Sequence, residues 1–288
     1  MKKPPHMDLS KSDYRSNQDS GGYFPSLEDA LQYEDKVKGT EYHSDQIRAL
    51  KILVDQIDNP VKSVLDFGIG DGGTLLALDL KPSQIIGVDT SESMINLAST
   101  KLNTVAFNGY VGSIEQISNL DSESTDLVLC LNTLGYLDKE EQDLFFSESF
   151  RVLRTDGYLI VMTGNELIDL FALNSGTAEF FERHFNQNRE LIADLLEAGS
   201  DIRFNNANRR NPLNFGVEMQ NYGFREVDQV FCSWHKIVPA AAIQMLKGDL
   251  QAARIQARDL KFDPSTLPKV ELWKRFFCCS IFASLLKK

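Results

Sequence analysis

The chain has 288 residues, of which 42% are hydrophobic and 25% charged, so it can form a sizeable core and is neither disordered nor fibrous in composition. Its formal net charge of −11 at pH 7 argues against nucleic acid as the main partner, because phosphate binding usually requires a basic face. No apolar stretch in the sequence approaches the about 18 residues needed to span a bilayer. We therefore expect a cytoplasmic protein that acts on neither nucleic acid nor membrane.

The cysteines indicate buried thiols. All four lie in apolar, strand-like runs, and the sequence contains no CxxC or His/Cys spacing typical of a metal site: Cys130, Cys232, Cys278 and Cys279. We expect free cysteines and no bound metal.

The first part of the chain is polar. Residues 1–25 are rich in Ser, Asp, Asn, Lys and Gly, which predicts a flexible tail or lid. Two helical patterns follow, one from Ser26 and one over about Ser44–Ile57. We expect both helices to pack against a sheet.

Apolar runs and helical patterns then alternate. Strands are predicted at Ser63–Phe67, Ile85–Asp89, Val105–Val111, Asp126–Leu131 and Tyr158–Met162, with helices beginning at Gly72 and about Ser91 and extending over Glu140–Leu153. This order indicates an α/β fold in which helices cover both faces of a mostly parallel sheet.

The alternation of apolar runs and helical patterns ends after the fifth predicted strand. Residues 165–222 are polar and include Arg209 and Arg210, which either grip an anionic group of a substrate or lie in a solvated loop. Strand character returns at Phe224–Trp234 and Phe276–Leu285. We therefore divide the chain into a tail or lid (1–25), a helical cap with a cofactor-binding core (26–164), a substrate-recognition insertion (165–222), and strands and a helix that complete the core (223–288).

The turn after the first predicted strand is rich in glycine: Asp66-Phe67-Gly68-Ile69-Gly70-Asp71-Gly72. Glycine lacks a Cβ, so the backbone can pass close to a ligand, and such a turn also suits NAD or FAD. Asp66 and Asp71 would repel a pyrophosphate, whereas a carboxylate suits the cationic amino-acid end of S-adenosylmethionine. Alternatively, Asp66 caps nearby backbone N–H groups. Asp89 ends the next strand, where a carboxylate accepts hydrogen bonds from ribose hydroxyls.

Three segments in order resemble the motifs of class I S-adenosylmethionine-dependent methyltransferases: Val64–Gly73, Ile86–Met94 and Arg151–Ile160. The resemblance covers roughly residues 60–165. It implies a Rossmann-like fold with a seven-stranded, mostly parallel sheet whose last strand is antiparallel. Phe276–Leu285 fits that last strand.

The resemblance also implies contacts with the cofactor. Gly68 and Gly70 approach it, Asp89 holds the ribose, and Met94 packs beside the adenosine or is plain core. Many members carry an Asp where this chain has Ser113, so the adenine would be held by backbone groups of Ser113 and Ile114. The complete predicted cofactor set is Asp66, Gly68, Gly70, Asp89, Thr90, Met94, Ser113, Ile114 and Leu131.

The substrate is expected beyond the carboxyl ends of the strands, as in other open α/β sheets. Asn132 and Tyr136 are candidates there, although Tyr136 also suits a half-buried aromatic at a helix start. A hydroxyl acceptor requires a general base, for which His235 and Glu166 are candidates; a surface or capped histidine is the alternative for His235.

These features predict a methyltransferase that uses S-adenosylmethionine and acts on a small molecule, with a hydroxyl slightly favoured and a sugar or secondary metabolite as possible acceptors. Two alternatives remain at this stage. One is an NAD-binding oxidoreductase with a Rossmann fold, and the other is a protein that binds S-adenosylmethionine as a scaffold without catalysis.

Overall fold

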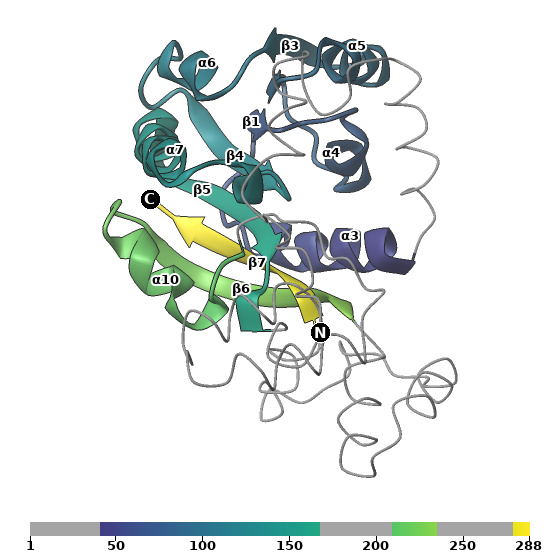
Figure 1. The fold of residues 1–288 in the computed structure, drawn as a ribbon. Helices are drawn as coiled ribbons and strands as arrows, with labels where there is room; N and C mark the ends of the chain where they lie inside the picture. Colours follow the sequence, from purple (N-terminus) through teal and green to yellow (C-terminus); the bar gives the residue numbers. More distant parts are fainter. Residues whose placement is uncertain (1–40, 168–208, 235–278) are drawn as a thin grey trace, which may run out of the picture.

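The computed structural model describes residues 41–167, 209–234 and 279–288 (Figure 1). Its strands are β1 (Ser63–Phe67), β2 (Gln84–Asp89), β3 (Ala106–Val111), β4 (Thr125–Leu131), β5 (Leu153–Gly164), β6 (Arg225–Trp234) and β7 (Cys279–Lys287). They form one seven-stranded sheet in the order β3-β2-β1-β4-β5-β7-β6.

Strands β1 to β5 run parallel, while β7 pairs antiparallel with both β5 and β6. This arrangement confirms the predicted mostly parallel sheet with an antiparallel last strand. It differs from the dinucleotide-binding order 3-2-1-4-5-6, because β7 is inserted between β5 and β6.

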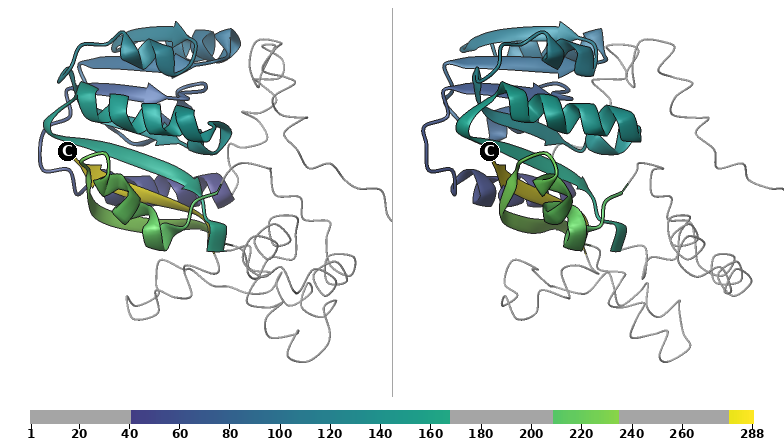
Figure 2. Two further views of the ribbon diagram at one scale, coloured as in Figure 1. Left: turned by 60° about the vertical axis from the view of Figure 1, so that its left-hand side comes forward. Right: turned by 90° about the vertical axis from the view of Figure 1, so that its left-hand side faces the viewer.

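The helices are α3 (Glu41–Val54), α4 (Gly73–Ala77), α5 (Glu92–Lys101), α6 (Ile114–Ser118), the short 3-10 helix η2 (Leu134–Tyr136), α7 (Lys139–Val152) and α10 (Pro212–Gln220). Their apolar residues fall into two clusters: α6, α7 and α10 contribute to one, and α3, α4 and α5 to the other. Figure 2 shows α7 and α10 on one side of the sheet and α3 on the other. The expected coverage of both faces is confirmed.

The residues of β5 explain how one strand supports both clusters. Side chains alternate between the faces of a strand, so Leu159 and Val161 pack in the first cluster while Tyr158, Ile160 and Met162 pack in the second. Each of these side chains is at most 2% exposed. Full burial of one such aliphatic side chain stabilises the folded state by about 1.5–3 kcal/mol. A continuous apolar run therefore favours a central strand, in which both faces are covered.

Capping residues set the helix starts. The Ser91 hydroxyl accepts a hydrogen bond from the Met94 N–H at 3.3 Å, which confirms the predicted start of α5. Asp138 and Glu141 form a reciprocal capping box at the start of α7. The helix predicted over Glu140–Leu153 ends one residue earlier, because Leu153 already belongs to β5 and pairs with Thr125 before the register shifts.

Helix α10 lies within the range predicted as an insertion, yet its Phe215 and Met219 are buried in the same cluster as α7. The division into four domains remains a prediction. Residues 1–40, 168–208 and 235–278 lie outside the described residues, so the predicted tail, the helix from Ser26 and most of the insertion have no structural description. In the described ranges, no helix is long and apolar enough to cross a membrane.

Candidate functional site

The glycine turn between β1 and α4 has a left-handed backbone at three positions: φ is +76° at Gly68, +56° at Gly70 and +74° at Gly72. A Cβ added to Gly68 would lie 2.0 Å from Oγ1 of Thr133, whereas no described atom lies within 4 Å of a Cβ added to Gly70. Packing therefore requires glycine at the first position. At the second, the missing side chain leaves open space beside the backbone.

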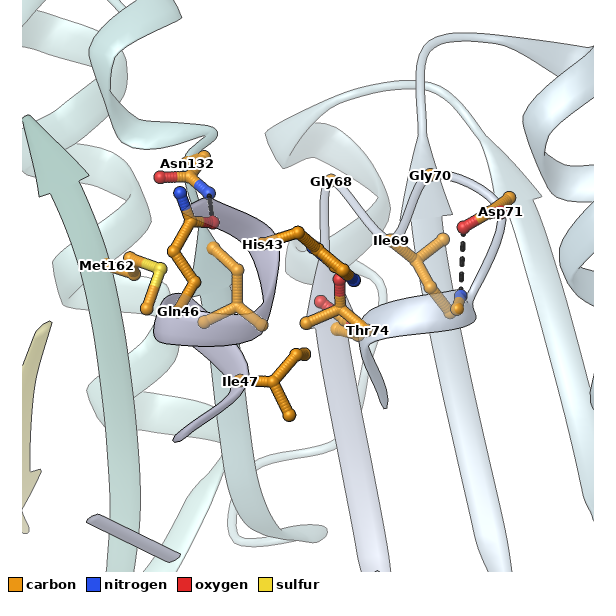
Figure 3. A pocket seen from close by; sticks show the side chains of 13 residues that line it. His43, Gln46, Ile47, Gly68, Ile69, Gly70, Asp71, Thr74, Asn132 and Met162 are labelled. Carbon is orange, nitrogen blue, oxygen red and sulfur yellow. Dashed lines mark hydrogen bonds between the residues drawn. The ribbon is translucent and has the colours of Figure 1, made fainter. Parts of the chain in front are cut away.

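A cavity of about 130 Å³ lies over this turn (Figure 3). Its walls come from the first turns of α3, the glycine turn and the ends of β4 and β5, namely His43, Gln46, Ile47, Asp66, Gly68, Ile69, Gly70, Asp71, Gly73, Thr74, Leu131, Asn132 and Met162. The cavity is therefore at the carboxyl edge of the parallel strands, as expected for a ligand site.

Asp66 is a buried carboxylate at the wall of this cavity. The residue is 2% exposed, and its Oδ1 atom has no hydrogen-bond partner among the described residues. Burial, and secondarily the charge of Asp89, raises the pKa of Asp66 to about 7. The alternative role of Asp66, capping of backbone N–H groups, does not account for the unpaired Oδ1 atom. An unpaired buried carboxylate is costly, so it suits a cationic ligand group such as the ammonium of S-adenosylmethionine.

Asp89 braces the glycine turn. One carboxylate oxygen accepts a 2.9 Å hydrogen bond from the Gly70 N–H, and the other accepts one of 2.9 Å from the Ser91 N–H. Burial raises the pKa of Asp89, although these backbone hydrogen bonds oppose the shift. Each oxygen has a further lone pair, so the predicted contact with ribose hydroxyls is compatible with both bonds.

Asp71 is compensated within the protein. Its Oδ1 atom accepts a 2.9 Å hydrogen bond from the Gly73 N–H, and its Oδ2 atom pairs with the Lys101 ammonium. The expectation that Asp71 repels a pyrophosphate is therefore wrong, and the electrostatic argument depends on Asp66 alone. The sequence does not reveal this ion pair, because Lys101 lies on α5, 30 residues after Asp71.

The structure gathers part of the predicted cofactor set at the cavity: Asp66, Gly68, Gly70 and Leu131 line it. The others, Asp89 included, are not among its lining residues. Met94 is 1% exposed and Ile114 4%, and the Ser113 N–H already donates to Glu115 at 2.8 Å. Thr90 is exposed. Cofactor contacts of these residues remain predictions.

Of the four predicted substrate or base residues, Asn132 lines the cavity. Tyr136 is 36% exposed and Glu166 is buried at 9%, and neither belongs to the lining set of the described residues. The Glu166 N–H donates to the Arg210 carbonyl at 2.9 Å, which fixes its backbone beside the end of β5. His235 lies outside the described residues.

Three cavity residues on α3 were missed: His43, Gln46 and Ile47. The helical spacing that places Ile47 and Leu50 on the buried side continues back to His43 and Gln46, one turn earlier. That spacing predicts that His43 and Gln46 lie on the same side of the helix as Ile47 and Leu50. The sequence does not reveal that the first turn of α3 extends beyond the sheet and over the glycine turn.

The arginines of the predicted insertion are engaged elsewhere. Nη1 of Arg210 lies 3.5 Å from the Glu218 carboxylate, and a Cβ on Gly164 would meet Arg209 Cγ at 2.9 Å. Neither arginine is among the lining residues of the described cavity.

The cysteine prediction is confirmed for the described residues, in which Cys130, Cys232 and Cys279 are buried and free. Cys278 lies outside them. In the same described ranges, no group of three or more His, Cys, Asp or Glu side chains is placed to hold a metal ion.

Comparison with known proteins agrees with this geometry. Residues 65–161 match the family model described as a methyltransferase domain. This match assigns a methyltransferase domain to residues 65–161 of the chain. The unpaired Oδ1 atom of Asp66 and the space beside Gly70 are compatible with S-adenosylmethionine, the cofactor expected from the sequence.

Two curated relatives of this methyltransferase domain are a demethylmenaquinone methyltransferase of Bacteroides fragilis and a ubiquinone biosynthesis O-methyltransferase of Hahella chejuensis. The first is 32% identical over 102 residues, covering 33% of this chain and 39% of its own length. The second is 27% identical over 169 residues, covering 54% of this chain and 69% of its own length. The chain thus spans about two fifths of the first relative.

A solved S-adenosylmethionine-dependent methyltransferase of Archaeoglobus fulgidus superposes with a TM-score of 0.51 at 18% identity. The match covers 90% of this chain and 99% of that one. At this identity the likeness establishes the fold of the methyltransferase domain.

Proposed function

We propose that the protein transfers a methyl group from S-adenosylmethionine to a small-molecule acceptor. The observation that carries this proposal is the unpaired, buried carboxylate of Asp66 at a cavity over a glycine turn, inside the segment that matches a methyltransferase domain. A cation is the natural partner for such a carboxylate.

The residues have separate tasks in holding the donor. Asp66 pairs with the ammonium group, the backbone at Gly68 and Gly70 leaves room for the ligand, and Asp89 accepts hydrogen bonds from the ribose. When bound, S-adenosylmethionine supplies an electrophilic methyl group on a sulfonium sulfur. The protein chiefly has to align the acceptor with that methyl group and exclude water.

A hydroxyl acceptor needs a residue to take its proton. The titratable side chains that line the described cavity are His43, Asp66 and Asp71. Asp66 is assigned to the ammonium group, and Asp71 is paired with Lys101. We therefore assign the base to His43 in preference to Glu166, while His235 stays a sequence prediction.

The relatives support a small acceptor, since one is a demethylmenaquinone methyltransferase and the other a ubiquinone biosynthesis O-methyltransferase. A hydroxylated ring compound is accordingly the first acceptor class to test. The insertion of β7 between β5 and β6 weighs against an NAD-dependent oxidoreductase.

Calorimetric titration with S-adenosylmethionine and with NAD tests the donor. We expect binding of the first only, and binding of NAD alone would refute the proposal. Transfer of a labelled methyl group to a panel of hydroxylated aromatics, sugars and amines then tests catalysis. Binding of S-adenosylmethionine without transfer to any member would favour the scaffold alternative.

A further inference from the structure

Three side chains from distant parts of the chain form a continuous hydrogen-bond chain that begins at the cavity. Nδ2 of Asn132, after β4, donates to Oε1 of Gln46 on α3 at 3.1 Å. Nε2 of Gln46 in turn donates to Oγ of Ser233, at the end of β6, at 3.0 Å. Gln46 therefore links the cavity residue Asn132 to the far edge of the sheet.

The Ser233 end of this chain is firmly held. Ser233 is 1% exposed, its backbone has a φ of +58°, and its N–H donates to the Asp45 carboxylate at 2.6 Å. The Ser280 hydroxyl of β7 also donates to the Ser233 carbonyl at 3.2 Å. The first turn of α3 is thus fastened to β6 through two adjacent residues, Asp45 and Gln46, so Gln46 reaches Asn132 from a fixed base.

The direction of the bonds determines which group Asn132 offers to a ligand. A carboxamide has two N–H donors on its nitrogen and one acceptor oxygen. One N–H of Asn132 is committed to Gln46, which fixes the plane of the carboxamide, and no described residue donates to the Asn132 oxygen. Figure 3 shows the two carboxamides beside each other, with a dashed line from the Asn132 nitrogen to the Gln46 oxygen. The backbone adds to the fixation, since the Asn132 N–H donates to the Met162 carbonyl at 2.8 Å.

We propose that Gln46 is a positioning residue that fixes the Asn132 carboxamide at the cavity, where the Asn132 oxygen accepts a hydrogen bond from an O–H or N–H group at or beside the methylated atom of the acceptor. The inference rests on the proposed function and narrows its acceptor class. A site built to accept a hydrogen bond discriminates strongly against analogues that lack the donor, because its own acceptor is then left unpaired.

The first test uses the side-chain amide protons of Asn132, observed by NMR in protein labelled with 15N-asparagine and saturated with S-adenosylhomocysteine. Gln46→Met removes both hydrogen-bonding atoms, and we expect the Asn132 protons to exchange at least tenfold faster. Gln46→Glu keeps an acceptor toward Asn132, while the Ser233 hydroxyl rotates to donate, so protection should return. Gln56→Met is the matched control, because Gln56 bonds to Asp228 of β6 at 2.7 Å, away from the cavity.

The second test uses the best acceptor found in the labelled-methyl panel. Gln46→Met should lower kcat/KM roughly fivefold to tenfold, the worth of about one hydrogen bond, through a higher acceptor KM and an unchanged KM for S-adenosylmethionine. Gln46→Glu should restore the acceptor KM, and Gln56→Met should not alter it.

Two results would overturn the inference: Asn132 protons that respond to Gln56→Met as they do to Gln46→Met, or a best acceptor without any O–H or N–H group. A wild-type protein that fails to bind S-adenosylhomocysteine would instead refute the proposed function. The two failures are therefore distinguishable.

Discussion

The backbone N–H of Gly70 donates a 2.9 Å hydrogen bond to the carboxylate of Asp89, so the glycine turn after β1 and the end of β2 behave as one unit. Asp89 thereby has two tasks. It fixes the loop over which the donor is proposed to lie, and it keeps lone pairs available for ribose hydroxyls.

Asp89→Ala should weaken S-adenosylmethionine binding by about 2–4 kcal/mol, because two hydrogen bonds to the cofactor are lost and the turn loses its brace. Calorimetric titration measures the affinity. Asp79→Asn is a suitable control, since Asp79 carries only an exposed ion pair with Lys51 on the described surface. Unchanged affinity in a folded Asp89→Ala variant would refute the assignment.

The two glycines of the turn should respond differently to alanine. Gly68→Ala brings a Cβ within 2.0 Å of the Thr133 hydroxyl, so we expect the free energy of unfolding to fall by about 3 kcal/mol or more. Gly70→Ala meets no described atom within 4 Å and should cost only about 1–2 kcal/mol for its positive φ, yet its methyl group occupies space intended for the ligand.

Urea unfolding and calorimetric titration separate the two effects. Gly70→Ala protein that binds S-adenosylmethionine as tightly as the wild type would contradict the assigned role of that turn.

Asp66 should make the stability of the cofactor-free protein depend on pH. Its pKa is raised from an ordinary value of 3.8 to about 7 in the folded state, so the folded protein binds more protons than the unfolded chain between those values. The stabilising effect of the protonated carboxyl is complete below pH 3.8 and is lost as the pH rises through 7.

Asp66→Asn removes this ionisation. The variant should be more stable than the wild type at pH 8.5, by on the order of 2–4 kcal/mol, while binding S-adenosylmethionine more weakly. Urea unfolding from pH 5 to 8.5 without cofactor checks the first effect. Parallel pH dependences for the two proteins would show that Asp66 does not titrate in this range.

Asn132 has both a conformational and a chemical reason to be asparagine. Its φ is +59°, a region that glycine adopts freely and asparagine more readily than most residues. Asn132→Gly should therefore change the free energy of unfolding by less than about 1 kcal/mol and leave cofactor affinity intact, but lower kcat/KM for the acceptor at least tenfold. Steady-state kinetics measures this loss. Wild-type turnover by Asn132→Gly would show that the Asn132 side chain does not contact the acceptor and that only its backbone conformation matters.

The described cysteines should be chemically inert in the folded protein. Burial raises the pKa of the Cys130 and Cys232 thiols above the ordinary range, and nearby Asp66 and Asp45 respectively act in the same direction. Iodoacetamide at pH 8 should label Cys130, Cys232 and Cys279 only after denaturation, as followed by mass spectrometry. Rapid labelling of Cys130 in native protein would show that β4 opens to solvent.

The sheet was predictable because its strands are short apolar runs with turn residues between them, and β1 was predicted at its observed bounds, Ser63–Phe67. The positions of Asp66, Gly68 and Gly70 followed from that strand. The opposite wall of the cavity did not, because it depends on contacts between residues far apart in sequence. Gln46 and Asn132 are 86 residues apart, and Gln46 and Ser233 are 187 apart.

Charge compensation was a second limit. The sequence shows that Asp71 is acidic, but it does not show that Lys101 at the end of α5 forms an ion pair with it. The predicted repulsion of a pyrophosphate therefore holds for Asp66 and not for Asp71. Asp66 behaved differently. Asp66 is buried without a counter-ion among the described residues, so its unpaired Oδ1 atom supports the assignment made from the sequence.

The position of β7 between β5 and β6 has a consequence for biosynthesis. Strand β6 contacts the rest of the sheet only through β7, among the described strands, although β7 follows it in sequence. Since Ser233 of β6 anchors the first turn of α3, that wall of the cavity is fastened only after Cys279–Lys287 has left the ribosome and paired with both neighbours. A nascent chain that has already folded β1 to β5 would thus hold the donor loop without its opposite wall, and donor binding should appear late in synthesis.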